Sequence, residues 1–234
     1  MERDMNDFFQ ESVFAGVTLS LVAYALGAAL KRKFKMGILN PLMISIVVSI
    51  VVLVVGKVDY ETYNEGAKYL SYLLTPATVC LAIPLYEQWP LLKKHYKAVI
   101  AGLLAGTVTS LTTVLVLSRI CGLSHAEYVT LLPKSITTAI GMGISEELGG
   151  YVTITVAVII VTGVLGNMFG ELICKIFCIT EPISKGLAFG ASSHAIGTAK
   201  ALELGEAEGA MSGLAIAFSG IFTVCLASLF ANLL

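Results

Sequence analysis

The sequence has little charge for its length. Only 13% of its 234 residues are Asp, Glu, Lys or Arg, whereas 56% are hydrophobic. Soluble domains carry about 25% charged residues. Apolar surface on this scale stays out of water only where lipid covers it. We therefore expect an integral membrane protein, and a formal net charge of −1 leaves no basic surface for nucleic acid.

Catalytic and metal-binding motifs are missing from the sequence as well. It has no phosphate-binding G-x-x-x-x-G-K-[ST] loop, no G-x-S-x-G nucleophile elbow and no H-E-x-x-H. The five cysteines include no C-x-x-C pair, and cysteine in apolar segments acts as a small hydrophobe. We expect no enzyme, no cofactor and no bound metal. The acidic start, MERDMNDFFQE, argues against a cleaved signal peptide, whose first residues are basic.

Long uncharged runs are what the chain has in abundance. About 20 apolar residues cross a bilayer as a helix. We expect full crossings at 12–30, 38–56, 98–118, 151–170 and 209–234, and a kinked one at 69–86, which contains Pro76 and Pro84. The predicted fold class is an all-α polytopic membrane protein with about 6 full transmembrane helices. We expect a single membrane domain over 1–234, with a short tail at 1–11, N-terminal helices at 12–119 and two interrupted units at 120–234.

Two further segments, 128–145 and 186–199, are too polar to be simple crossings. Pro133 and Lys134 interrupt the first, and the second has His194 in a stretch of 14 residues between Lys185 and Lys200. Irregular backbone at membrane depth is tolerated only where protein or a water cavity satisfies it. Each segment is expected to be either a re-entrant helical segment or a broken full crossing, and both alternatives stay open.

The positive charges predict an orientation. Clusters lie at 31–35, at 93–97, and at Lys175 with Lys185. All of them fall on the cytoplasmic side if both interrupted segments re-enter the face from which they came. The N-terminus then lies outside, and the two re-entrant segments enter from opposite faces.

A weak internal repeat relates the two segments with inverted topology. Sliding 135–150 onto 195–210, an offset of 60 residues, places Lys134 opposite His194. Interrupted segments in corresponding positions indicate the binding site of a transporter. The identical pairs are Ile136/Ile196, Thr138/Thr198, Ala139/Ala199, Glu146/Glu206 and Gly149/Gly209.

The first interrupted segment has the composition of an anion site. A proline suits the first turn of a helix, where free N–H groups and the positive end of the dipole gather beside hydroxyls and an ammonium. The alternative is a capped helix whose lysine snorkels and whose threonines bond to carbonyls. The candidate substrate-binding residues here are Pro133, Lys134, Ser135, Thr137 and Thr138.

The second interrupted segment has a histidine beside hydroxyls and small residues. His194 titrates near neutral pH and can carry a proton or bind a carboxylate. The alternative is a histidine satisfied at a helix–helix contact. The candidate substrate-binding residues are Ser192, Ser193, His194, Gly197 and Thr198.

Acidic residues follow each segment. We take Glu146 and Glu203, with His194, as candidate coupling residues and expect Glu147, Glu206 and Glu208 to be solvated. An echo of the first segment around Pro76 and Thr78 makes these two secondary candidates. Asn40 is a third, although for Asn40 and Asn167 a contact between helices is the commoner role.

The chain resembles the LrgB/CidB family of bacterial membrane proteins, the larger partners of holin/antiholin-like pairs. The resemblance runs from about residue 30 to the C-terminus. The matching stretches are Asn40-Pro41-Leu42, LTPATVCLAIPLYEQ (74–88), LLPKSITTAI (131–140) and GLAFGASSHAIGTAKALELGEAEGAMS (186–212).

The resemblance implies two functions. Such proteins are named for modulating murein hydrolase activity and programmed lysis together with a small LrgA/CidA-like membrane partner. Similar sequences form part of a plastidic glycolate/glycerate translocator and of bacterial pyruvate transport systems. We expect transport of small monocarboxylates, ion- or proton-coupled, with the antiholin-like function as the alternative. The expected setting is the bacterial cytoplasmic membrane, with the lipid bilayer, a small carboxylate solute, an LrgA/CidA-like partner and further copies of the chain as partners.

Overall fold

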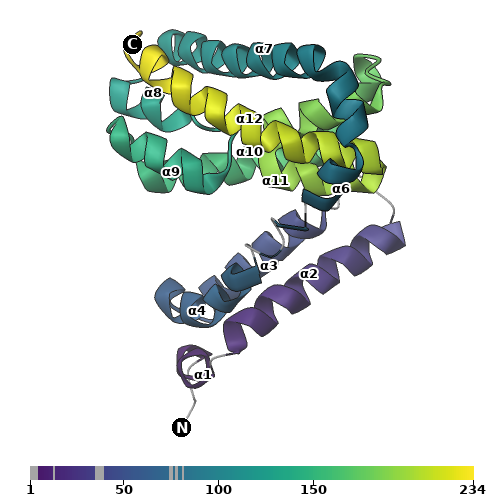
Figure 1. Cartoon of the computed structure of the whole chain (residues 1–234). Helices are drawn as coiled ribbons and strands as arrows, with labels where there is room; N and C mark the ends of the chain where they lie inside the picture. The colour runs from purple at the N-terminus through teal and green to yellow at the C-terminus, as the bar shows by residue number, and fades with distance from the viewer. Residues whose placement is uncertain (1–4, 13, 35–39, 74–75, 77–78, 81) are drawn as a thin grey trace. The chain divides into compact units, whose positions relative to one another are not determined.

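The computed structural model describes residues 5–12, 14–34, 40–73, 76, 79–80 and 82–234 (Figure 1). The secondary structure of these residues is helical throughout. The chain divides into two compact units, Met1–Cys80 and Leu81–Leu234. The prediction of one membrane domain over the whole chain stays a prediction.

The first unit contains α1 (Met5–Glu11), α2 (Ala15–Phe34), α3 (Pro41–Val55), α4 (Tyr60–Ala67) and the 3₁₀ helix η1 (Lys68–Leu73). Helices α2 and α3 pack closely because Gly27 of α2 has no side chain: a Cβ there would lie 2.7 Å from the carbonyl oxygen of Pro41. On the other side of α2, Ser20 shares a 2.7 Å hydrogen bond with the Tyr63 hydroxyl of α4.

Helix α3 is shorter than predicted. Its 15 residues rise about 22 Å, less than the roughly 30 Å of hydrocarbon that a straight span must cross. The helix begins after Asn40, whose Oδ1 accepts hydrogen bonds from the amides of Leu42 and Met43, and it ends at Gly56. The full crossing expected at 38–56 is therefore a short apolar helix, and Asn40 is a helix cap.

The second unit contains α6 (Ala82–Glu87), α7 (Trp89–Cys121), α8 (His125–Leu131), α9 (Thr138–Glu147), α10 (Val152–Ile176), α11 (Pro182–Leu204) and α12 (Glu206–Ala231). Helix α7 ends because Gly122 takes a left-handed conformation with φ 67°. Ser124 and Glu127 then form a capping box that starts α8.

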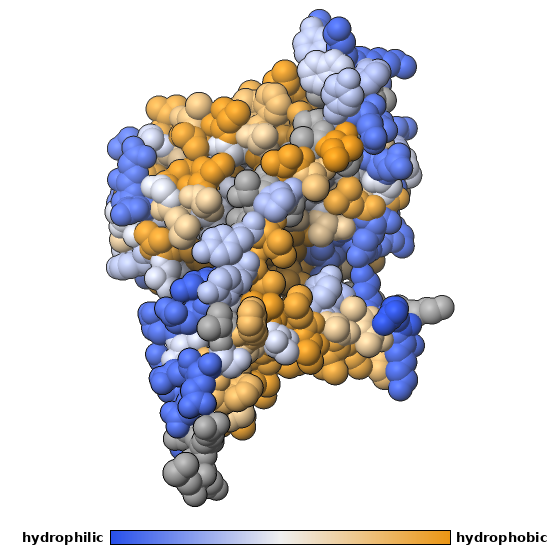
Figure 2. Space-filling view, turned by 60° about the horizontal axis from the view of Figure 1, so that its bottom comes forward, coloured by the Kyte–Doolittle hydropathy of each residue, from blue (hydrophilic) through white to orange (hydrophobic). Residues whose placement is uncertain are grey.

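Three described helices are long and apolar enough to cross a membrane, and a bent pair, Met5–Glu11 with Ala15–Phe34, would make a fourth. The three are Lys93–Cys121, Val152–Ile176 and Glu206–Ala231, where the sequence predicts crossings at 98–118, 151–170 and 209–234. Large hydrophobic side chains remain exposed on them, and Figure 2 shows broad apolar patches with hydrophilic margins. The total of about six crossings stays a prediction.

The predicted kink within 69–86 lies partly outside the described residues. Helix η1 ends at Leu73 and α6 begins at Ala82. Pro76 is exposed, whereas Thr78 lies outside the described residues.

Candidate functional site

Helix α11 is broken at His194. This residue has φ 43° and ψ −138°, values far from those of a helix. A Cβ on Gly197 would lie 2.5 Å from the carbonyl oxygen of Phe189 and 2.6 Å from the Ser193 Cβ. In a straight helix, residues eight apart are separated by about 12 Å. The chain therefore turns back on itself at His194.

We call this element the second hairpin, with an outgoing limb at 182–193 and a return limb at 195–204. The outgoing limb runs beside α12 in the same direction, since Gly186 abuts Glu208 and Gly190 abuts Ser212. The return limb runs the opposite way. Its Thr198 shares a 2.7 Å hydrogen bond with Ser212, while Leu202 packs on Gly209.

A glycine face on α10 receives the break. A Cβ on Gly163 would lie 2.7 Å from Cε1 of the His194 ring, and one on Gly166 would overlap the Ser193 side chain. Gly170 abuts the ring of Phe189 in the same way. Side-chain-free positions on α10 thus let the polar apex of the second hairpin lie directly against this helix.

Two hydrogen bonds hold the apex in place. The His194 Nε2 lies 3.0 Å from the carbonyl oxygen of Ile159, and Asn167 donates a 2.7 Å hydrogen bond to the carbonyl oxygen of Ile196. Asn167 therefore has the helix-to-helix role expected of it. Because the backbone around a helix break lacks its usual partners, these bonds satisfy groups that would otherwise be left unpaired at membrane depth.

The first interrupted segment is also a hairpin. Helix α8 ends at Leu131, residues 132–137 are not helical, and α9 begins at Thr138. A Cβ on Gly141 would lie 3.6 Å from both Cβ and the carbonyl oxygen of Pro133, again eight residues away. We call residues 125–147 the first hairpin.

Buried hydroxyls fasten the two limbs of the first hairpin to α10. The Thr155 Oγ1 lies 2.9 Å from the carbonyl oxygen of Thr130 and 2.7 Å from the Ser145 Oγ. The amide of Tyr151 donates a 2.7 Å hydrogen bond to Thr130 Oγ1. At the exposed start of α8, hydrogen bonds from the side chain and then the backbone of Ser124 lower the pKa of the Glu127 carboxyl.

Both breaks meet the same residue of α10. Gly141, in the first hairpin, abuts the side chain of Ile159, and His194, in the second, bonds to the Ile159 carbonyl oxygen. Ile159 is fully buried. Two segments about 60 residues apart in the sequence thus approach one point on a single spanning helix.

Lys134 lies half-buried at the first break. Its Nζ donates a 2.9 Å hydrogen bond to Ser135 Oγ, which lies 3.2 Å from the Ser110 Oγ of α7. Among the described residues, no carboxylate forms an ion pair with Lys134. Thr137 is the N-cap of α9 but forms no capping hydrogen bond through its side chain.

The remaining candidates are placed as follows. Ser192 is exposed, donates to the carbonyl oxygen of Ala188 and lies 2.9 Å from the Ser193 Oγ. Glu146 is exposed, and Glu203 is an exposed partner of Lys200 at 3.2 Å. Among the hydrogen bonds of the described residues, none joins Lys134 or Ser135 to the second hairpin.

Glu208 departs from the sequence prediction. It was expected in solvent, but it is only 9% exposed, and its carboxylate folds back against Gly205. Glu206, two residues earlier, is exposed as expected. The two glutamates lie in one polar stretch, so no local signal separates them; the difference comes from the outgoing limb of the second hairpin, which packs over Glu208.

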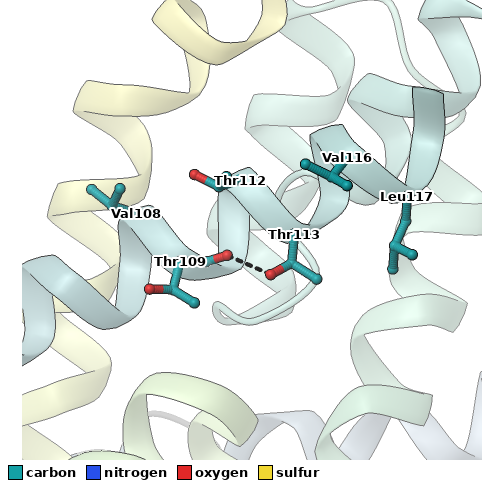
Figure 3. Close-up of a pocket in the computed structure, with 6 residues that line it drawn as sticks. All are labelled: Val108, Thr109, Thr112, Thr113, Val116 and Leu117. Atoms are coloured by element: carbon teal, nitrogen blue, oxygen red, sulfur yellow. Dashed lines mark hydrogen bonds between the residues drawn. The ribbon is translucent and has the colours of Figure 1, made fainter. Parts of the chain in front are cut away.

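Two cavities lie away from the breaks. One, of about 340 Å³, is a hollow on one face of α7, where Thr113 donates a 2.7 Å hydrogen bond to the carbonyl oxygen of Thr109 (Figure 3). Its lining residues are Val108, Thr109, Thr112, Thr113, Val116 and Leu117. The second, of about 320 Å³, lies at the base of the second hairpin and is lined by Glu171, Cys174, Lys175, Cys178, Ile179, Thr180, Lys185 and Leu204.

These features define a class: an all-helical membrane protein in which two helical hairpins abut one spanning helix. Comparison with known proteins then gives the family. A profile described as the LrgB-like family matches residues 20–233, and the chain belongs to this family. The resemblance inferred from the sequence motifs is confirmed.

Relatives with curated names support the same assignment. Proteins named "Antiholin-like protein LrgB" from Bacillus mycoides (strain KBAB4), Bacillus cereus (strain B4264) and Bacillus anthracis (strain CDC 684 / NRRL 3495) are each 38% identical to this chain over 218 residues. The match covers 93% of this chain and 95% of each relative. No solved structure matches the chain. The printed names favour the antiholin-like alternative over monocarboxylate transport.

Proposed function

We propose that this protein is an antiholin-like component of the bacterial cytoplasmic membrane that restrains permeabilisation and autolysis together with a small membrane partner. The observation that carries the proposal is the 38% identity, over 93% of the chain, to proteins named for that property. The membrane setting agrees with the three long apolar helices.

The surface of α7 suits contact with another membrane helix. Gly102 and Gly106 lie on an exposed face with nothing within 4 Å of where a Cβ would be, and the threonine-lined hollow follows on the same helix. Small residues and hydroxyls on a spanning helix favour close helix packing in lipid. These features support association with the partner or with further copies of the chain.

The experiment for this function is an autolysis assay in cells. Deleting the gene should speed detergent-induced lysis and raise uptake of a membrane-impermeant dye, and expressing the protein again should reverse both changes. Lysis and dye uptake that are the same with and without the protein would contradict the antiholin-like function.

A second candidate function is passage of small monocarboxylates such as pyruvate, glycolate, glycerate or lactate. One observation favours it: two helix breaks abut a single residue, Ile159, and one of them has a lysine without a carboxylate partner among the described residues. Broken helices whose ends point into a membrane domain recur at the substrate sites of transporters. In this reading the hydroxyls and His194 bind the carboxylate.

Counterflow of labelled monocarboxylates in proteoliposomes tests the second function. Selective counterflow without leakage of a bulky dye is expected, and His194→Ala should reduce it at least tenfold. His125→Ala, at the exposed start of α8, is the matched control and should leave counterflow unchanged. Leakage of dye and solute alike, or full counterflow in His194→Ala, would contradict this site.

We also propose that both hairpins are re-entrant, so that each enters and leaves on one membrane face. The contacts across each break support this arrangement, since Pro133 lies by Gly141 and Phe189 by Gly197. With an outside N-terminus and the first hairpin entering from outside, Lys175 and Lys185 lie in the cytoplasm, as the positive-inside bias favours.

A further inference from the structure

Helix α12 has a polar stripe along its buried face. Glu208, Ser212, Ser219 and Thr223 recur at intervals of 4, 7 and 4 residues, so they line one side of the helix, and all four are at most 9% exposed. The hydroxyl of Ser219 has no hydrogen-bond partner within the described part of the chain. A spanning helix that needed only to pack would gain nothing from these groups, because buried polar atoms without partners are costly.

Glu208 stands at the start of this stripe. Its carbonyl group abuts Gly186 of the outgoing limb, and its carboxylate lies against Gly205, where a Cβ would collide with Oε2. Within the described residues its carboxylate has no hydrogen bond and no ion pair. A buried carboxylate that lacks a cation is easier to hold in its neutral, protonated form.

The stripe connects this carboxylate to the break at His194. One turn after Glu208, Ser212 shares a 2.7 Å hydrogen bond with Thr198 of the return limb. Thr198 in turn donates a 3.1 Å hydrogen bond to the His194 carbonyl oxygen. A change at Glu208 is therefore two side chains away from the apex of the second hairpin.

Charged residues on the neighbouring elements lie elsewhere. On the return limb, Lys200 pairs with Glu171 and Glu203. On the outgoing limb, Lys185 is half-buried and lines the cavity at the hairpin base. Glu87 of α6 and the charged residues at the start of α7 (Lys93, Lys94, His95 and Lys97) are exposed or half-buried, as is Glu206 on α12 itself.

We propose that Glu208 is a proton-binding site of the membrane domain. It takes a proton from water at the membrane face where α12 begins, becoming a neutral carboxylic acid, and returns it to the same water. The hydroxyl pair Ser212–Thr198 transmits this change to the backbone of His194. The proposal goes beyond both functions above and depends on neither.

Infrared difference spectroscopy of the purified full chain in lipid tests the proposal. Between pH 5 and pH 9 the wild-type protein should gain and lose the carbonyl stretch of a protonated carboxylic acid. Glu208→Gln should remove that band. Glu206→Gln, an exposed glutamate one half-turn away on the same helix, should keep it. No titrating band in the wild type, or a band that survives Glu208→Gln, overturns the proposal.

Hydrogen–deuterium exchange tests the link to the break. Amide exchange across 194–212 should change at least threefold over the same pH range in the wild type and in Glu206→Gln, and should be independent of pH in Glu208→Gln. Thr198→Val should keep the infrared band but lose the pH response of exchange. If Glu208→Gln fails to fold, Glu208→Asp must move the midpoint of the band; an unmoved midpoint assigns the proton to another group and overturns the proposal.

Discussion

At the scale of single residues, His194 is the position where the backbone departs most from the helix around it. A non-glycine residue at φ 43° and ψ −138° lies in a region that glycine occupies far more easily, at a cost of about 1–3 kcal/mol. The sequence signals a break in 186–199 through its polar letters, and the structure places that break at the histidine itself. The same residue thus supplies the reversal of the chain and the ring that contacts α10.

This strain gives a prediction with its own control. Both His194→Gly and His194→Ala remove the ring and its contact with Ile159, but only glycine relieves the backbone. His194→Gly should therefore be more stable to unfolding than His194→Ala by about 1–2 kcal/mol. At Ala199, an exposed helical position of the return limb, Ala199→Gly should instead destabilise by about 1 kcal/mol.

Thermal unfolding of the three variants in one detergent measures both differences. If His194→Ala were the more stable of the two His194 variants, the residue would not be strained and the reversal at His194 would be contradicted.

Glu208 marks the limit of reading residues one at a time. The stretch around Glu203, Glu206 and Glu208 has a single local pattern, and charged residues in such a stretch are most often solvated. Only the packing of the outgoing limb along α12 buries one of them. Burial of this kind depends on a contact between segments about 20 residues apart, which composition and spacing do not encode.

At the scale of elements, the long helices follow from uncharged runs and were predicted at the right places. The short helix α3 was not, because the run at 38–56 is uncharged throughout while its helix is limited by the cap at Asn40 and by Gly56. The repeat is similar: sequence identities align at an offset of 60, whereas the contacts Pro133–Gly141 and Phe189–Gly197 correspond at an offset of 56 (189 − 133). Small residues are so common here that identity alone cannot fix the register.

The glycine face of α10 gives the prediction at this scale. Gly166→Ala places a methyl group where Ser193 lies, so it should destabilise the protein by about 1–3 kcal/mol. Gly106→Ala on α7 is the matched control, because a Cβ there meets nothing within 4 Å, and it should be neutral or stabilising by up to about 1 kcal/mol.

Unfolding in detergent or in bicelles, followed by circular dichroism, compares the two variants. Equal stability of Gly166→Ala and the wild type would mean that the second hairpin does not rest on α10 as described.

At the scale of the whole molecule, the central claim is that both interrupted segments reverse direction and abut the same spanning helix. The family assignment does not depend on it, but the site does. If either segment crossed the membrane fully, Lys134 and His194 would not both lie beside Ile159, and the reading of the breaks as a binding region would fail. The sequence left re-entry and a full crossing open, since both satisfy the same apolar lengths.

The most direct measurement is cysteine accessibility in intact cells. The five native cysteines are replaced, and single cysteines are introduced at His125 and Glu147, which flank the first hairpin, and at Thr180 and Glu206, which flank the second. A membrane-impermeant maleimide should label positions 125 and 147 from outside, and should reach 180 and 206 only after the membrane is opened. Labelling of 125 and 147, or of 180 and 206, from opposite faces would contradict the account.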